Sequence, residues 1–476
     1  MAAPMSNILR SWKFSYLKSV RVICRTYLSD TYSCDELWNK RLEAKSVKGI
    51  NAKKFGIGIW NKCDEEHAVQ LLDMDLFSTK VNTLKLDEEY IAKEVIFRFR
   101  HSQCSFPIKD CIVHSIVRGY IEAGFVDRLI PLMQDKDQYG LLPDDQAMCI
   151  LLNYLLTEKK YAEAGQVAYE VMLQEDYNHI LKNMLALIAA VKHFTHTCTF
   201  KRYEPQQLGD EDPQYIPKSV ITNPYYDDHF DIKDERFLLG KTLYNLGKHT
   251  QGLDGTLSRT LQLIGLGLYE KFELANQLLT SWMNDSSLDT IVYEIAIEKY
   301  EQYLEEAPHR DPHKAEKKMG EKTIDDEIEL LRLTPDEKLD CIQKFEVMKR
   351  QLKSKSGTEN DIEKAVEDFI WNQKLPKYEE TDTQILKKNY EKWMRDRERK
   401  FEVATRRVLV ADVEGRVQER LEVLQERQEL LEYFDNLPEI RFLQKYRKEE
   451  VEVVEKQEEF VQAPGERNIK LKIKKK

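Results

Sequence analysis

The chain has 476 residues, a third of them charged, and its formal net charge at pH 7 is −10. This length accommodates about three ordinary domains, and the acidic balance excludes a protein that coats nucleic acid uniformly. Strand signals are scarce and stretches that alternate Glu with Lys or Arg are long, which favours exposed helices over a compact enzyme core. Apolar runs are shorter than a bilayer requires, so we expect no membrane span.

The first 27 residues predict a mitochondrial transit peptide. They contain no acid, since the first carboxylate of the chain is Asp30, and on a helical projection the cations lie largely opposite the apolar residues. Arg25-Thr26-Tyr27 resembles a matrix-peptidase site. The alternatives are an ordinary first helix and a secretory signal, which is less favoured because no uninterrupted apolar core is present. The cations are Arg10, Lys13, Lys18, Arg21 and Arg25.

Residues 28–305 are predicted to form a domain of helical hairpins. A helix is expected over Glu88–Arg100, where apolar residues recur at helical spacing. The clearest signal lies at 111–172, where one pattern occurs twice at a spacing of 35 residues. A fixed period of this size indicates stacked hairpins, because each unit buries its apolar faces only against a neighbour. The alternative is a plain bundle with two hairpins that are similar by coincidence.

Each copy of the repeat is predicted to contain two helices joined by a turn. In the first copy Gly124 stands where a helix should end, because glycine accepts the left-handed conformation. Gly140 and Pro143 then interrupt the chain, and Asp144 or Asp145 can cap the next helix. The second copy is less regular, since Lys159 replaces the turn glycine and the terminal Gly-x-x-Pro-Asp is missing.

The rest of this domain is expected to be discontinuous. An apolar helix is predicted over 179–198, and residues 199–234, with four prolines and many acids, are predicted as an insertion. Helical hairpins resume near Glu235. Residues 306–333 are polar and are predicted as a linker.

A charged helical, coiled-coil-like region is predicted over 334–460. Thr334 begins it as an N-cap, with proline next and glutamate three residues on. Two imperfect apolar seams favour a packed helix pair over one long coiled coil, with a solvated single helix as the alternative. Pro438 is expected to end or kink this helix, and residues 461–476 form a basic tail. The first seam contains Leu386, Tyr390, Trp393, Phe401, Ala404, Val408 and Ala411, and the second, after a register shift near Gly415, contains Val417, Leu421, Leu424 and Leu431.

Catalytic motifs are missing from the sequence. It contains no Walker loop, dinucleotide fingerprint or nucleophile elbow, so we expect no enzyme, no cofactor and no small-molecule substrate. His193, His196 and Cys198 are three possible zinc ligands, but a fourth is not evident and no metal is predicted. The acidic patch at 227–231 lacks calcium-loop spacing. The eight cysteines form no Cys-x-x-Cys pair, which suits a reducing compartment.

The repeat resembles the pentatricopeptide repeat, a 35-residue relative of the tetratricopeptide repeat, through the spacing from Gly124 to Gly140-Leu141-Leu142-Pro143-Asp144. Residues 97–175, from Phe97-Arg98-Phe99-Arg100-His101-Ser102 to Glu170-Val171-Met172-Leu173-Gln174-Glu175, resemble a family of divergent pentatricopeptide proteins of the metazoan mitochondrial small ribosomal subunit. The resemblance implies a solenoid of pentatricopeptide/tetratricopeptide-like hairpins. The long charged C-terminal helices predicted from periodicity exceed what the family implies, and together the two regions predict an all-α fold. The resemblance also implies the mitochondrial matrix and no enzyme activity.

The same resemblance implies a structural component of that subunit, in contact with its ribosomal RNA and neighbouring ribosomal proteins. In base-reading repeats a position near the start of the first helix is usually Asn, Thr or Ser, whereas the matched residues here are His114 and Cys149. Asp144 does match at the repeat end. Contacts to RNA shape and phosphates are therefore favoured over base reading. The alternatives are a free mitochondrial RNA-processing or stability factor and a protein-binding helical scaffold.

Two groups of cations are the predicted RNA-contact residues. Lysines in the tail can neutralise phosphates and release counterions, and the other group surrounds the clearest repeat. The repeat group is Arg98, Arg100, Lys109 and Arg118, and the tail group is Lys470, Lys472, Lys474, Lys475 and Lys476.

Overall fold

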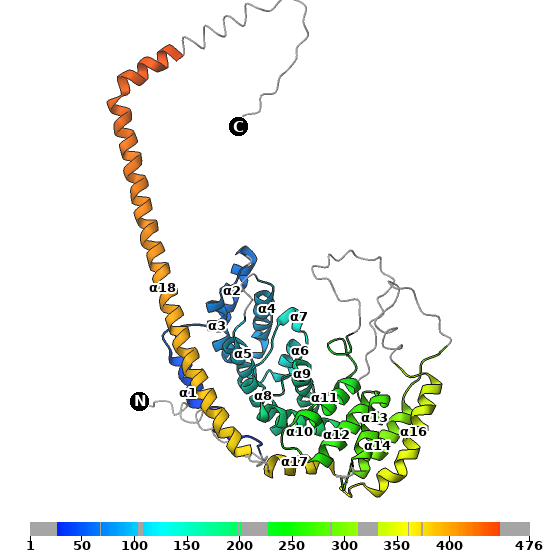
Figure 1. The fold of residues 1–476 in the computed structure, drawn as a ribbon. Coiled ribbons are helices and arrows are strands. Elements are labelled where there is room, and N and C mark those ends of the chain that lie inside the picture. Colours follow the sequence, from blue (N-terminus) through cyan, green and yellow to red (C-terminus); the bar gives the residue numbers. More distant parts are fainter. Residues whose placement is uncertain are drawn as a thin grey trace, which may run out of the picture. The chain divides into compact units, whose positions relative to one another are not determined.

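The computed structural model (Figure 1) describes residues 26–66, 68–102, 108–197, 200, 227–285, 288–312, 332–359, 361–372 and 375–447. The predicted presequence, insertion and linker lie largely outside these residues, and the basic tail lies wholly outside them. The described chain is helical almost throughout and divides into two compact units, Met1–Glu398 and Arg399–Lys476. The prediction of an all-α fold is confirmed.

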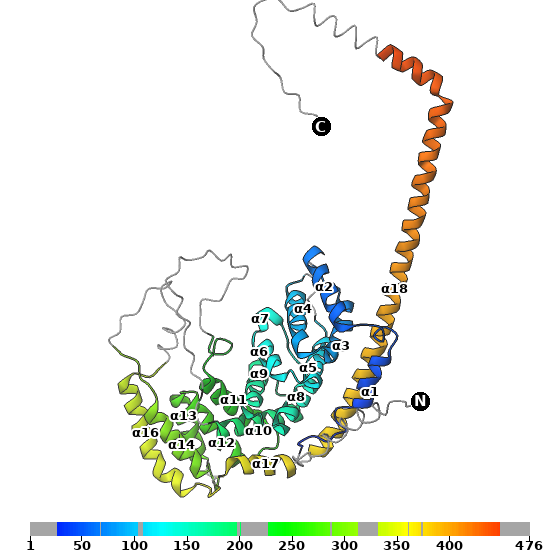
Figure 2. The same ribbon diagram turned by 180° about the vertical axis from the view of Figure 1, so that it is seen from behind.

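Helical hairpins follow one another along the first unit, as Figures 1 and 2 show. Neighbours in the series pack together, α8 with α9, α9 with α10 and α11 with α12, so each hairpin buries its faces on the next. The helices are α1 (Asp35–Lys40), α2 (Ala52–Glu66), α3 (Leu71–Lys80), α4 (Glu89–His101), α5 (Asp110–Ala123), α6 (Val126–Gln134), α7 (Lys136–Tyr139), α8 (Asp145–Thr157), α9 (Tyr161–Gln174), α10 (Ile180–His196), α11 (Glu235–His249), α12 (Gly255–Leu268), α13 (Phe272–Asn284) and α14 (Glu294–Glu306).

The turns after α5, α8 and α12 share one geometry. Gly124, Lys159 and Glu270 adopt left-handed φ angles of 76°, 59° and 60°. In each turn the next amide donates to a carbonyl five residues back, which is the Schellman arrangement of a helix end. Lys159 therefore keeps the predicted turn without glycine, although its Cβ makes the left-handed conformation less favourable. The bonds are Phe125 N to Tyr120 O at 2.8 Å, Lys160 N to Leu155 O at 2.9 Å and Lys271 N to Leu266 O at 3.1 Å.

One apolar stripe, at helical spacing along α5, lies in the core of the first unit. Ile112, Ile116 and Tyr120 have no exposed surface, and they pack into one cluster that continues through the later hairpins. Full burial of a side chain of this size contributes about 1.5–3 kcal/mol to folding. The stripe thus supplies the contact on which the neighbouring hairpins stack.

Residues 334–398 belong to the compact first unit and do not form a separate domain. Helix α16 (Pro335–Ser354) begins with the predicted capping box, in which the Thr334 amide donates to Glu337 Oε2 at 2.8 Å. This helix packs on α13 and α14, and α17 (Ile362–Asn372) packs on α10. The compact first unit therefore extends to Glu398, beyond the boundary expected at 334, because the buried faces of α16 and α17 find their partners in the hairpins.

Helix α18 (Leu375–Asp435) contains both predicted seams. Leu386 and Tyr390 of the first seam are buried against Trp38, so the start of this seam packs on the chain's own N-terminal segment. Val408 and Ala411, at its end, are exposed. From Glu402 to the end of α18 nearly all the residues are exposed. Helix α18 ends at Asp435 and a helical segment resumes at 437, so the helix is interrupted next to Pro438, as predicted.

Candidate functional site

Equivalent positions of the two repeat copies form two adjacent pairs. His114 lies in α5, and Asp144 precedes α8 as its N-cap residue. The His114 Nδ1 atom is 2.9 Å from Asp144 Oδ1, and the imidazole is fully buried. Thirty-five residues on, Cys149 lies in α8 and His179 is the N-cap residue of α10. These are the positions that base reading would use in the resembled repeats.

Tyr390 of α18 covers the first pair. The His114 Nε2 atom lies 2.8 Å from Tyr390 Oη, and Arg118 Nη1 donates to the same oxygen at 2.7 Å. The donors align in one direction, from Arg118 to Tyr390, to His114 and to the Asp144 carboxylate. Burial raises the pKa of Tyr390, so its hydroxyl stays protonated and donates to His114. The chain therefore satisfies this pair itself.

Asp382 of α18 covers the second pair. Its carboxylate accepts bonds from His179 Nε2 at 3.1 Å, from Gln146 Nε2 at 2.9 Å and from the Tyr32 hydroxyl. Burial opposes the charge, but these bonds outweigh it and lower the pKa of Asp382. Asp382 is therefore ionised. It is 4% exposed, and its oxygens accept hydrogen bonds from three side chains.

Cys149, His179 and Asp382 offer ligand atoms within 4.8 Å of one another, which is close enough to hold a metal ion. The hydrogen bonds argue against one. His179 Nδ1 accepts the Lys182 amide at 3.2 Å, so a neutral ring carries its proton on Nε2 and donates it to Asp382. Burial raises the pKa of Cys149, which keeps it a thiol. To bind a metal, the thiol would have to lose its proton and His179 would have to give up its bond to Asp382.

We expect Asp382→Asn to lower the free energy of unfolding at pH 7 by about 2 kcal/mol, the range for hydrogen bonds to a charged group. The native pKa of Asp382 is depressed, so its stabilisation is present above the unfolded pKa and is lost as pH falls through the native one. The difference from the unsubstituted protein should therefore shrink below about pH 4. Urea unfolding at pH 7 and pH 3 measures it, with Asp396→Asn as control. An equal difference at both pH values would contradict the assignment.

The contacts of α18 continue toward the N-terminal hairpins. Arg397 donates to Asp75 Oδ1 of α3 through Nε at 3.0 Å and Nη2 at 2.8 Å, and both side chains are almost fully buried. The Ser46 hydroxyl donates to Glu398 at 2.6 Å. The first part of α18 thus contacts α10, α8, α5 and α3 and covers the positions that match the base-reading ones of the resembled repeats.

Arg98, Arg100 and Lys109 lie near the clearest repeat. Arg98 donates to Glu94 at 2.8 Å and also pairs with Asp64, so acids already offset its charge. The Arg100 guanidinium donates to the Asp137 carbonyl at 3.4 Å, its side chain is exposed, and no ion pair of this arginine is found among the described residues. Lys109 is half-buried just before α5. Arg100 is therefore the most accessible of these predicted RNA contacts.

The prediction for Arg118 requires correction. Only 5% of this residue is exposed, and its guanidinium donates to the Ser33 carbonyl, Asp35 and Tyr390. An arginine enclosed by such partners stabilises the contact between the hairpins and α18 and is not presented to a phosphate. The five tail lysines lie outside the described residues.

The histidines of the possible zinc motif and Asp228 of the acidic patch have charged partners within the chain. His193 is fully buried, with Nε2 3.2 Å from Glu235, and His196 Nε2 is 3.2 Å from Glu363. The two histidines thus face different glutamates, while the third possible zinc ligand, Cys198, lies outside the described residues. In the acidic patch Asp228 pairs with Lys271 at 2.9 Å.

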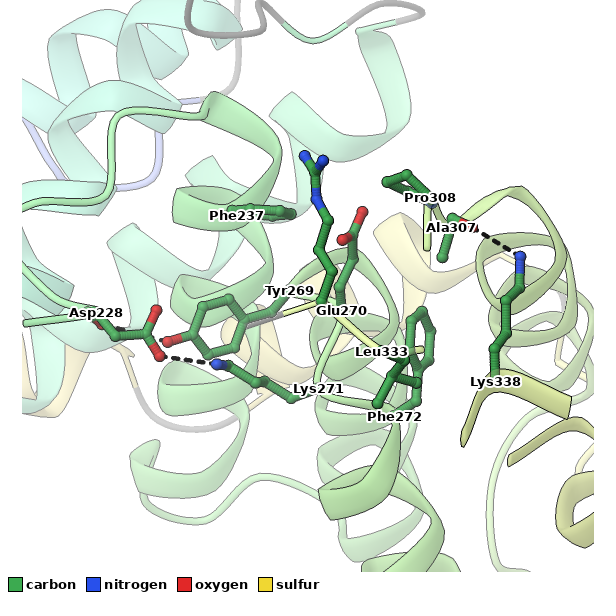
Figure 3. A pocket seen from close by; sticks show the side chains of 11 residues that line it. Asp228, Phe237, Tyr269, Glu270, Lys271, Phe272, Ala307, Pro308, Leu333 and Lys338 are labelled. Atoms are coloured by element: carbon green, nitrogen blue, oxygen red, sulfur yellow. Dashed lines mark hydrogen bonds and ion pairs between the residues drawn. The ribbon is translucent and has the colours of Figure 1, made fainter. Parts of the chain in front are cut away.

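Figure 3 shows a pocket lined by residues from α11, the turn after α12 and the start of α16. Lys271 points to the Asp228 carboxylate at 2.9 Å, and Tyr269 donates to the Asp228 carbonyl at 3.3 Å. Lys338 donates to the Ala307 carbonyl at 2.7 Å. Both ammonium groups are thus held in place by oxygens of the chain itself.

The family model described as mitochondrial 28S ribosomal protein S27 matches residues 1–423, which cover the first unit and α18 as far as Val423. Within the described residues, none of the helices is both long and apolar enough to cross a membrane.

Proposed function

Because the chain belongs to the mitochondrial 28S ribosomal protein S27 family, we propose that it acts as a non-catalytic structural protein that binds ribosomal RNA by shape and phosphate contacts. Family membership makes it a protein of the small subunit of the mitochondrial ribosome, in the matrix, with ribosomal RNA and ribosomal proteins as partners. The match over residues 1–423 is the observation that carries this function.

The way in which it would bind RNA follows from α18. Tyr390 and Asp382 engage the residues at the base-reading positions of both repeats, so a base could reach them only if the helix left. RNA contacts through accessible surface cations need no such opening. Arg100 and the tail lysines are the proposed phosphate contacts, because Arg98 is paired with acids and Arg118 is buried.

Sedimentation of a mitochondrial lysate tests the proposed function. We expect the chain, followed by mass spectrometry, to migrate with the small subunit in constant proportion to its other proteins. Nuclease treatment should shift the chain together with the subunit, since RNA holds the particle together. Migration in light fractions would overturn the structural role, and substoichiometric association with one transcript would indicate an RNA-processing factor instead.

Neutralising the tail lysines should weaken retention in the subunit. Each lysine that contacts a phosphate adds about 0.7–0.9 to the slope of log affinity against log salt. Replacing all five with glutamine should therefore release the chain at lower salt and with a shallower slope, measured by salt washes of purified subunits. A matched control replaces five lysines elsewhere with glutamine, and an equal effect of control and tail would refute the tail contact. The control set is Lys344, Lys353, Lys364, Lys388 and Lys392, which are exposed.

A further inference from the structure

One column of aliphatic residues repeats every seven positions along the second unit. Its members are Val403, Val410, Val417, Leu424 and Leu431 of α18, and we call it the d seam. A strict seven-residue repeat brings side chains to one slowly turning stripe of a helix, which matches the left-handed supercoil of a coiled coil. Each member is 47–57% exposed, so in the described residues the d seam has no partner.

The flanking positions disfavour a second copy of this chain. In a parallel pair of identical helices, the core also contains the residue three positions before each member of the d seam. Each such residue faces its own copy on the other helix, which places Arg407 beside Arg407 and Glu414 beside Glu414. In an antiparallel pair of identical helices, the residues four positions before the members of the d seam flank the core, and those of one helix face those of the other. Three of those are Arg406, Arg420 and Arg427, so arginines meet in every well-overlapped register. Like charges at these positions are destabilising.

The charge balance also disfavours RNA as the occupant. Between Arg399 and Arg447 the chain has ten basic and ten acidic residues, so the segment has no net charge. A phosphate backbone is attracted by excess positive charge, which this surface lacks. Apolar side chains spaced by heptads instead require another apolar helix face, because water is removed only by close packing of the two seams.

From these patterns we infer that the d seam binds an amphipathic helix of a different polypeptide in a two-stranded coiled coil. The partner helix carries aliphatic residues at heptad spacing, acids facing Arg406, Arg420 and Arg427, and a base facing Glu414. The inference rests on the proposed function only in locating the partner within the small ribosomal subunit. It concerns residues 403–431 and is independent of the basic tail.

Photocrosslinking in intact small subunits tests the inference. The photoreactive residue p-benzoylphenylalanine replaces Val410 in the full chain, and adducts are mapped by mass spectrometry. We expect one adduct, with a peptide of another protein that has the heptad and charge pattern stated above. Leu424→Lys with Leu431→Lys should reduce the adduct at least about tenfold. Lysine and leucine have similar helix propensities, so α18 is retained.

The matched control is Leu409→Lys with Leu430→Lys, which makes the same chemical change at two exposed leucines outside the d seam. It should leave the adduct within about twofold, since these residues face away from the partner. An adduct with a second copy, an adduct with RNA, no adduct, or equal loss in both double variants would overturn the inference. Sedimentation of the unsubstituted chain tests the proposed function separately, because its position does not depend on the d seam adduct.

Discussion

Replacing Arg397 with methionine is expected to lower the free energy of unfolding of the first unit by about 3–5 kcal/mol. Arg397 donates two hydrogen bonds to Asp75 Oδ1, and each residue is 4% exposed. Methionine fills a similar volume but leaves the aspartate charge buried without its partner. That uncompensated charge, rather than the lost attraction, produces most of the effect. Urea unfolding followed by near-ultraviolet circular dichroism measures the change.

Two further variants separate this mechanism from a general effect of substitution in α18. Arg395→Met changes an exposed arginine of the same helix and should alter stability by less than about 0.5 kcal/mol. The double variant Asp75→Leu with Arg397→Met removes both charges and should recover most of the loss. If the double variant is as unstable as Arg397→Met, packing rather than charge holds α18 at this point.

The hairpin fold follows from local patterns in the sequence. The 35-residue spacing predicted the turns at Gly124 and Lys159, and the Thr334 capping box predicted the start of α16, because such signals act within a few residues. Lys159 also shows that glycine is not required at the turn. The Lys159 backbone keeps the left-handed φ angle with a side chain present. The second repeat copy therefore has the same turn as the first, although its sequence lacks the turn glycine.

The position of α18 could not be predicted in this way. Periodicity showed that Leu386 and Tyr390 need an apolar partner, but that partner lies near the other end of the chain. Tyr390 and His114 are 276 residues apart, and Asp382 and Gln146 are 236 apart. A sequence pattern shows that a surface is to be buried and not what buries it. The error over Arg118 has the same origin, since its partners come from distant segments.

The contact between α11 and α12 carries the second large prediction. A Cβ at Gly265 would lie 2.6 Å from the Gly240 carbonyl oxygen and 2.6 Å from the Tyr244 nitrogen. Both are backbone atoms, so no side-chain rotation can relieve the overlap and the two helices must separate. We expect Gly265→Val to lower the free energy of unfolding by about 3 kcal/mol, at the upper end of overpacking effects.

Helix propensity acts in the opposite direction and is too small to offset this. Valine is favoured over glycine inside a helix by less than about 1 kcal/mol, so the overlap determines the sign at Gly265. Gly58 of α2 isolates that contribution, because a Cβ there meets no atom within 4 Å. Gly58→Val should leave thermal stability unchanged or slightly raised, while Gly265→Val lowers it. Similar melting temperatures for both variants would mean that α11 and α12 can accept a Cβ at Gly265 despite its 2.6 Å approach to backbone atoms of α11.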